Sequence, residues 1–86
     1  MLRITLSTLA EKTTVVLEGR LGGPWVDELS ACWHRLTETR DAGSIRIDLH
    51  GVTYVDPAGK VLIRELCGAG ATLVATEVMA RTIQDV

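Results

Sequence analysis

The chain has 86 residues, a length that suits one hydrophobic core and leaves no room for a second one of useful size. Hydrophobic residues make up 47% of it and charged residues 23%, which is the composition of a globular protein and excludes a disordered or fibrous one. The formal net charge is -2, and the 9 Lys and Arg residues are scattered along the sequence. Because nucleic-acid binding needs a clustered positive excess, we expect no nucleic-acid partner.

Cysteine usage and hydropathy indicate the compartment. Cys32 and Cys67 both fall in segments with helical spacing, and two buried free thiols are favoured over a disulfide. No apolar run approaches the ~20 residues that span a bilayer. Residues 1–6 alternate in polarity, unlike the apolar stretch of a signal peptide. The sequence therefore predicts a cytoplasmic protein without a membrane span.

Two strands are expected at the start of the chain. Apolar and polar residues alternate over residues 2–7, which is the period of a strand with one covered face. Residues 7–12 are expected to form a turn, and a second alternating strand covers residues 13–21. Since the connection is short, we expect the two strands to pair as an antiparallel hairpin.

Helical spacing begins after residues 22–23. Pro24 suits the first turn of a helix, where a missing N–H costs nothing, and residues 41–43 end this helix. Six residues form its apolar stripe and the flank of that stripe: Trp25, Leu29, Cys32 and Leu36, flanked by Val26 and Trp33. Trp25 is expected in the core. Trp33 is expected either to pack over the sheet edge or to be partly exposed, as a contact for a partner or a second copy.

The middle of the chain predicts a strand followed by a helix. The clearest strand covers residues 44–49, and a short extended piece follows at residues 53–55. Asp56 is a suitable N-cap for the next helix, with Pro57 in the first helical position. Residues 68–70 end this helix. Its buried face is expected to consist of Ala58, Leu62, Ile63 and Leu66.

Residues 71–76 predict a fourth strand, and residues 77–86 predict the start of a third helix that is cut short. The strand–helix–strand units require parallel neighbours joined by right-handed crossovers. Alternation within the strands indicates that one face of the sheet is uncovered. We therefore predict an α/β fold of two layers, a four-stranded mixed sheet with helices on one face. Seven residues are expected on the open face: Arg3, Thr5, Glu18, Arg20, Arg46, Asp48 and His50.

Residues 45–59 (IRIDLHGVTYVDPAG) resemble the signature of STAS domains. In that family an apolar strand ending in Asp-Leu leads through Gly-Val to Asp-Ser-Ser/Thr-Gly at the start of a helix. Residues 17–21 (LEGRL) are similar to the family's second-strand motif. The resemblance covers nearly the whole chain. It implies a single STAS-like domain over residues 1–86 with a shortened C-terminal helix.

The resemblance also implies a function. The STAS domains of bacterial anti-sigma factor antagonists are non-enzymatic modules of signal transduction and transcription regulation. In the unphosphorylated form they bind a protein partner, an anti-sigma factor that is also a kinase. Here the loop and helix start at residues 51–62 would make that contact, and the partner-binding residues would be Thr53, Asp56, Pro57, Ala58, Gly59 and Lys60. A homodimer and a different regulator as partner stay open.

The chain departs from the family at the phosphorylation site. The family's phospho-acceptor Ser directly follows the motif Asp, and this position holds Pro57, followed by Ala58. Neither residue has a hydroxyl, so a phosphate cannot block docking there. Three interpretations stay open: a constitutive binder, regulation at another residue such as Thr53 or Thr76, or a diverged domain with another partner. Residues 22–24 also depart, because antagonists often have Asp there.

Other chemistry is not indicated. His34 and His50 lack further ligands at metal-binding spacing, and Asp48 is expected to brace a loop and not to act as a catalytic acid. The sequence has no nucleophile–base pair and no phosphate loop, so we expect neither a cofactor nor enzymatic activity. The alternative function is a STAS module that senses a nucleotide or an anionic lipid at the helix start beside Asp56.

Overall fold

The computed structural model describes residues 1–84, and its elements follow the predicted order. The elements are β1 (Leu2–Leu9), β2 (Lys12–Leu21), α1 (Pro24–Thr37), a 3-10 turn (Ala42–Ser44), β3 (Ile45–Val55), α2 (Pro57–Gly68), β4 (Thr72–Val74) and α3 (Glu77–Gln84). The strands form one sheet in the order β1-β2-β3-β4, in which only the β1–β2 pair is antiparallel. The predicted third helix ran to residue 86, and residues 85–86 lie outside the described range.

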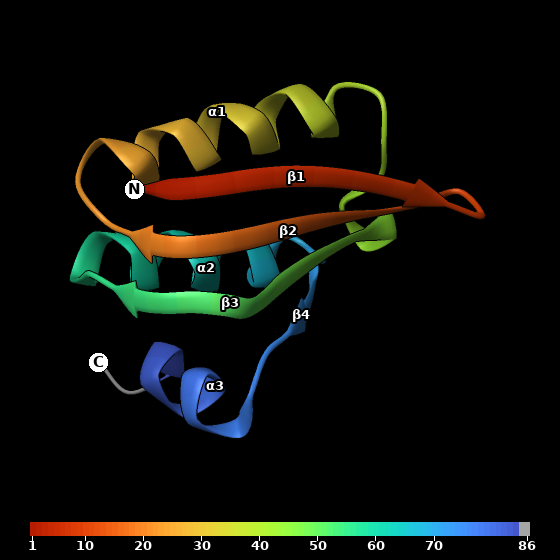
Figure 1. Ribbon diagram of the computed structural model, residues 1–86. Helices are drawn as coiled ribbons and strands as arrows, with labels where there is room; N and C mark the ends of the chain where they lie inside the picture. The colour runs from red at the N-terminus through yellow and green to blue at the C-terminus, as the bar shows by residue number, and fades with distance from the viewer. Residues whose placement is uncertain (85–86) are drawn as a thin grey trace.

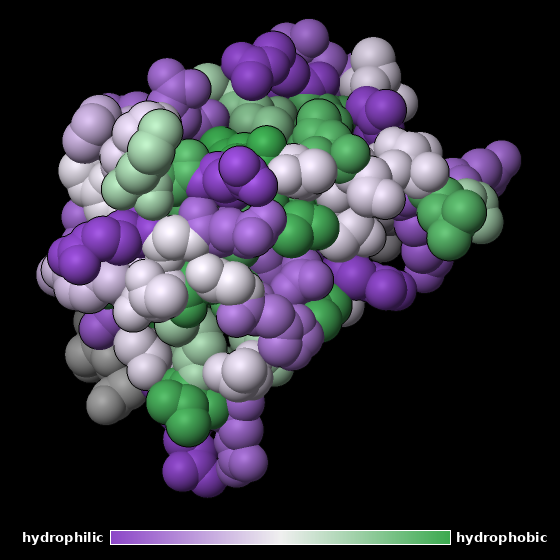
Figure 2. Space-filling model, in the orientation of Figure 1, coloured by the Kyte–Doolittle hydropathy of each residue, from purple (hydrophilic) through white to green (hydrophobic). Residues whose placement is uncertain are grey.

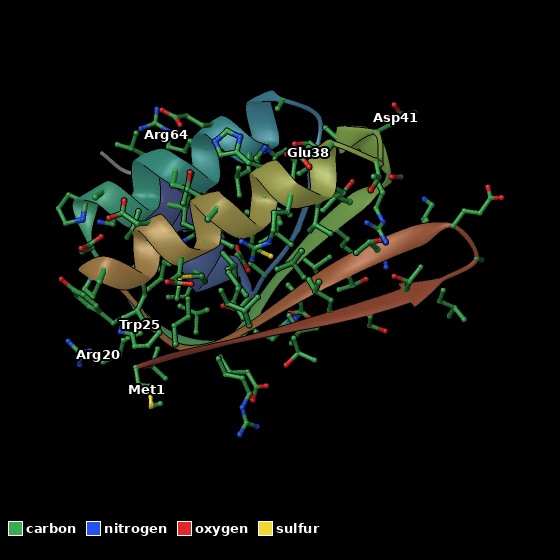
Figure 3. All side chains as sticks on the ribbon, turned by 90° about the horizontal axis from the view of Figure 1, so that it is seen from above. Met1, Arg20, Trp25, Glu38, Asp41 and Arg64 are labelled. Carbon is green, nitrogen blue, oxygen red and sulfur yellow. The ribbon has the colours of Figure 1, made fainter. Side chains whose placement is uncertain are left out.

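The helices lie on one face of the sheet, as predicted. Figure 1 shows the strands in front of α1 and α2, and the view from above in Figure 3 places all three helices on the same side. On the other face the residues expected to be uncovered are exposed, apart from the half-buried Asp48. Figure 2 shows this face as a mixture of polar and apolar side chains. The two-layer α/β prediction is therefore confirmed.

The core lies between the sheet and the helices. The inward side chains of β2 and β3, among them Leu17 and Ile47, are fully buried against the apolar sides of the helices. On α2 the buried residues are Gly59, Leu62, Ile63 and Leu66. The prediction that Ala58 is buried is wrong, because the helix turns position 59 toward the sheet. A Cβ at Gly59 would lie 2.9 Å from Val55 Cγ1, so only glycine allows this close approach.

Of the two tryptophans of α1, Trp25 is less buried than predicted. Trp33 is 8% exposed and belongs to the core, whereas Trp25 is only half-buried. The buried face of α1 is formed by Leu29, Cys32, Trp33 and Leu36, which is the i, i+3, i+4, i+7 stripe of one helix face. Trp25 lies in the first turn of α1 and packs against the core only in part. Of the two alternatives for Trp33, packing is the one present, and a partner contact is not.

The first hairpin is tighter than predicted. The expected turn at residues 7–12 shrinks to Ala10 and Glu11, whose φ angles are 53° and 67°. Two consecutive residues with positive φ form the type of turn whose twist matches that of paired strands. Alanine and glutamate lack the Asn-Gly pattern that normally announces such a turn, and for this reason the sequence pattern missed it.

β3 is one continuous strand, and not the predicted strand, loop and short extended piece. Its register with β2 shifts twice, between Val16 and Glu18 and between Gly19 and Arg20. At the first shift the single residue Leu17 lies opposite two residues of β3, and at the second shift β3 has Thr53 as an extra residue. Each shift is a β-bulge. The bulges bend the strand while its pairing continues to the start of α2.

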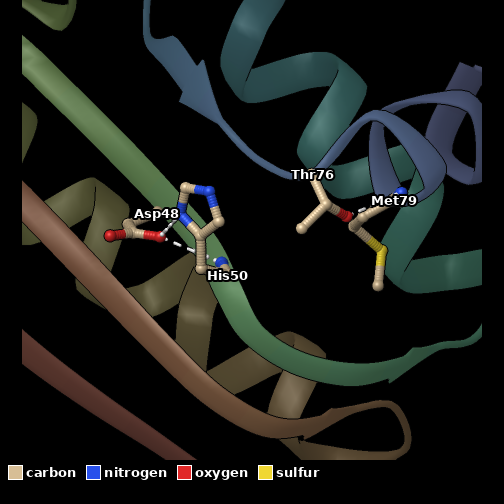
Figure 4. A network of polar contacts seen from close by, with 4 residues as sticks. All are labelled: Asp48, His50, Thr76 and Met79. Carbon is tan, nitrogen blue, oxygen red and sulfur yellow. Dashed lines mark hydrogen bonds and ion pairs between the residues drawn. The ribbon is translucent and has the colours of Figure 1, made fainter.

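Side chains satisfy backbone groups beside both bulges. Asp48 Oδ1 accepts from the backbone N–H of His50 at 2.9 Å and also contacts His50 Nδ1 at 2.9 Å (Figure 4). The His50 backbone N–H is the main cause that lowers the pKa of the Asp48 carboxyl, followed by the imidazole contact. Thr53 Oγ1 donates to the Gly19 carbonyl at 3.2 Å. The bracing role expected for Asp48 is therefore present, at a bulge in place of a loop.

Both cysteines are free thiols. Cys32 is buried and Cys67 is half-buried, and burial raises the pKa of the Cys67 thiol, which makes it a weaker nucleophile at neutral pH. Within residues 1–84 no helix has the length and apolar character needed to cross a bilayer. The same residues contain no group of three His, Cys, Asp or Glu side chains placed to hold a metal ion.

We predict that Asp48→Asn lowers stability at neutral pH by up to about 1 kcal/mol. Asparagine keeps an acceptor for the His50 amide and loses only the charge. Because the pKa of Asp48 is lowered from 3.8 in the folded chain, the charge stabilises above that ordinary value, and its contribution disappears as the pH falls through the lowered pKa. Urea unfolding between pH 7 and pH 2 should show the two proteins converging. A difference that persists unchanged in acid would contradict this assignment.

Candidate functional site

The carboxylate of Asp56 joins the starts of two helices. Its Oδ1 accepts from the backbone N–H of Gly59 at 2.7 Å, which is the predicted N-cap of α2. Its Oδ2 accepts from the backbone N–H of Gly23 at 3.1 Å, at the N-cap position of α1. The backbone N–H of Asp56 donates to the Leu21 carbonyl at 3.0 Å. The N-cap prediction is confirmed, and the link to α1 is a second role that the sequence pattern did not indicate.

The topology explains why the two helix starts meet. β2 and β3 are parallel, so their carboxyl ends lie at the same edge of the sheet, and α1 and α2 both begin there. Gly23 has no side chain to cap α1, and its φ of 57° favours glycine. The Asp56 carboxylate therefore lies near the positive ends of both helix dipoles.

Residues 22–23 also contribute to this site. A Cβ at Gly22 would lie 3.1 Å from Asp56 Oδ2, tighter than an ordinary contact. Glycine at position 22 thus lets the backbone approach the carboxylate. The prediction of residues 22–23 as a simple helix boundary was incomplete, because they also form the wall against which Asp56 packs.

The six predicted partner-binding residues differ in how far their side chains are exposed to solvent. Thr53, Pro57 and Ala58 are exposed, Asp56 and Lys60 are half-buried, and Gly59 is buried. Gly59 therefore offers little surface and acts in helix–sheet packing. Val61 is 48% exposed and extends the surface along the next turn of α2. We call Pro57, Ala58 and Val61 the α2 surface. The i, i+1, i+4 spacing of these apolar residues was the sequence signal for Val61.

A shallow hollow of about 380 Å³ lies beside Asp56, at the same end of the sheet. Its lining residues are Met1, Arg20, Gly22, Gly23, Pro24, Trp25, Tyr54 and Asp56. Figure 3 shows Met1, Arg20 and Trp25 close together at this end of the molecule. The Arg20 guanidinium lies over the Tyr54 ring, with 4.6 Å between Cζ and the ring centroid. Within the described residues no carboxylate lies within salt-bridge distance of Arg20.

Sequence reasoning missed Arg20, Trp25 and Tyr54 as site residues. Arg20 and Tyr54 are partners across the parallel strands, but only after the second bulge has shifted the register. Alternation along each strand assigns a face to a residue and does not identify its cross-strand neighbour. The only signal in the sequence was the position of both residues at the end of a predicted extended segment.

We predict that Asp56→Ala lowers the free energy of unfolding by about 2 kcal/mol, because two backbone donors lose their acceptor. Asp56→Asn should cost less, since the amide keeps one acceptor oxygen. Asp41→Ala is the matched control, because the Asp41 side chain is exposed and makes no cap hydrogen bond. Urea denaturation measures all three. Equal losses for Asp56→Ala and Asp41→Ala would contradict the bridging role.

Comparison with solved structures identifies the fold. No protein-family model and no curated protein sequence matches the chain. Several solved structures are similar, among them the following two. The anti-sigma factor antagonist SpoIIAA in its unphosphorylated form has a TM-score of 0.65 and 18% identity, over 95% of this chain and 82% of that one. The structure described as Mglu has a TM-score of 0.57 and 20% identity, over 85% of this chain.

The chain spans 19% of the length of Mglu and most of the length of SpoIIAA. At identities of 18% and 20% these likenesses establish the arrangement of the elements. The chain therefore has the two-layer α/β fold of the anti-sigma factor antagonist SpoIIAA, which is the STAS fold that its sequence motifs resemble.

Proposed function

We propose that this chain is a non-enzymatic regulatory module of the anti-sigma factor antagonist type, acting in the cytoplasm and binding a partner protein through residues 51–62. The observation that supports it best is the Asp56-capped start of α2 within a SpoIIAA-like fold. This is the position at which the family's motif presents its docking surface. The partner class that follows is an anti-sigma factor or a related kinase-like regulator.

The α2 surface has the physical character of a docking site. Pro57, Ala58 and Val61 are exposed and apolar, and burying them against a partner would release water from all three. Asp56 fixes the turn that presents them, so little conformational entropy is lost on binding. Arg, Tyr and Trp side chains often dominate the binding energy of an interface. Arg20, Tyr54 and Trp25 line the hollow beside Asp56.

Of the three interpretations of the missing serine, we favour the constitutive binder. Pro57 cannot accept a phosphate. The hydroxyls of the two other candidates are occupied in the fold: Thr53 Oγ1 donates to Gly19, and Thr76 Oγ1 accepts from the Met79 backbone N–H at 3.1 Å (Figure 4). Phosphorylation of Thr53 would remove the proton that it donates and so break its bond to Gly19, whereas a phosphate on Thr76 would keep an acceptor at the start of α3. Control of this protein would then act on its abundance or on its partner.

A small-ligand sensor is the second candidate function. The hollow of about 380 Å³ falls within the size range of small-molecule sites. The Arg20 guanidinium has no salt-bridge partner within residues 1–84 and lies beside two aromatic rings, which suits an anionic ligand with a flat apolar part. The openness of this site to solvent favours the protein partner. Thermal-shift measurements with nucleotides and anionic lipids separate the two functions, because a sensor is stabilised by its ligand.

We predict that Ala58→Arg abolishes capture of a kinase-like partner from a lysate of the source cells. The bulky charge would replace a small apolar residue in the centre of the α2 surface. Ala69→Arg is the control, because Ala69 is an exposed alanine at the opposite end of α2, about 16 Å away along the helix axis. Immobilised wild type and both variants, with bound proteins identified by mass spectrometry, give the comparison.

Wild type and Ala69→Arg should retain the same anti-sigma or kinase-like protein, and Ala58→Arg should retain at least about tenfold less, equivalent to 1.4 kcal/mol. Circular dichroism must first show that all three proteins are folded. Capture of no such protein by the wild type, or equal capture by both variants, would refute the proposed docking surface.

We also predict that the captured kinase-like partner, given ATP, adds one phosphate to Pro57→Ser and none to the wild type. The substitution restores a hydroxyl at the family's acceptor position and leaves Ala58 and Val61, the other two residues of the α2 surface, unchanged. Intact-mass spectrometry detects the addition, and Ala58→Ser serves as the positional control. Phosphate on the wild type would show that another residue is the acceptor and that the protein is not a constitutive binder.

A further inference from the structure

No strand in the described part of the chain pairs with the outer edge of β1, which is eight residues long. The opposite edge strand, β4, has only three residues. Proteins usually blunt a long edge with a bulge, a proline or several charges. β1 pairs with β2 without a register shift, and its sequence LRITLSTL contains no proline and one charge, Arg3. In Figure 3, which looks down on this edge, no other element of the described chain crosses β1.

The unpaired backbone groups on this edge can be assigned to residues. The N–H and C=O of one strand residue point to the same side, and the side alternates along the strand. The Met1 carbonyl accepts from the Arg20 N–H. The backbone N–H and C=O groups of the odd-numbered residues of β1 therefore point toward β2. The residues whose N–H and C=O groups point away from the sheet are therefore Leu2, Ile4, Leu6 and Thr8.

The same edge has apolar side chains that the helices do not cover. Leu2 is buried in the core, Ile4 on the same side of the strand is half-buried, and Leu6 is 50% exposed. Exposure thus increases along β1 as the strand extends beyond the helix layer. Free hydrogen-bonding groups and exposed apolar side chains therefore occur on the same even-numbered residues.

We propose that the β1 edge binds the β1 edge of a second copy of this chain in antiparallel orientation, which joins the two sheets into one. A twofold axis through Thr5 places Ile4 opposite Leu6 of the second copy and Leu2 opposite its Thr8. The polar residues then face each other on the open side, with Arg3 opposite Ser7 and Thr5 opposite Thr5. This register keeps each side chain on its own face of the joined sheet.

Charge and pattern make the edge complementary to itself. In an antiparallel twofold contact both copies use the same strand, which runs in opposite directions in the two copies. The sequence of the strand must therefore be complementary to the same sequence read backwards. In the register through Thr5, the single charge, Arg3, faces a serine and no like charge, and the half-exposed Leu6 is covered by Ile4. A strand of another protein would need the same alternation to match this edge. The α2 surface lies on a different element, so the dimer would present two docking sites.

The test uses the full chain over a concentration series from about 1 µM to 1 mM, which spans the affinities of weak dimers. Sedimentation equilibrium should show a reversible monomer–dimer transition. Hydrogen exchange should show that the amides of Ile4 and Leu6 gain protection as the concentration rises, while those of Thr5 and Ser7 are protected throughout. A monomer at every concentration overturns the proposal, as does a dimer that leaves the Ile4 and Leu6 amides unprotected.

Two variants locate the interface. Leu6→Pro removes an N–H that points outward and leaves the bonds to β2 intact, so the monomer should fold while the dimer affinity falls at least about tenfold. Leu6→Lys places a charge on the edge and should have the same effect if Leu6→Pro fails to fold. Ala69→Arg, far from β1, should dimerise like the wild type. Undiminished dimerisation of either folded Leu6 variant overturns the proposal.

Discussion

One carboxylate determines how the end of the molecule at which α1 and α2 begin is built. Asp56 accepts backbone N–H groups from the starts of α1 and α2 and is tied through its own N–H to the end of β2. Three segments distant in sequence are thereby fixed around one side chain. A negative charge at this point is stabilised by two helix dipoles and by charge-assisted hydrogen bonds. The exposed residues that follow Asp56 owe their fixed position to this arrangement.

The bulges of β3 contribute the second part of the site. Each bulge shifts the pairing of β3 with β2, and the second brings Tyr54 beside Arg20. The backbone groups that the shifts disturb find side-chain partners in Asp48 and Thr53. A straight β3 would place different residues at the rim of the hollow. The hollow and the α2 surface therefore depend on irregularities in the strand as much as on its regular pairing.

Much of the fold followed from local patterns. Alternation and helical spacing predicted the element order and the single helix layer, and the cap at Asp56 needed only its neighbours Pro57 and Gly59. The predictions failed where the local structure is determined by packing between segments that are distant in the sequence. The bulges, the two-residue hairpin turn and the partial exposure of Trp25 depend on strand register, on strand twist and on how far the sheet extends under α1. These quantities have no local sequence signal.

The sequence by itself determined the type and order of the strands and helices, where α2 is capped, and that no hydroxyl stands at the family's acceptor position. These properties depend on near neighbours in the chain, whose chemistry is written directly in the sequence. Only the tertiary structure decided that Asp56 also binds the start of α1, that Arg20 meets Tyr54, and that β1 has a free edge. Each of these depends on which strands lie side by side and in what register, and that is settled by burying the core as a whole.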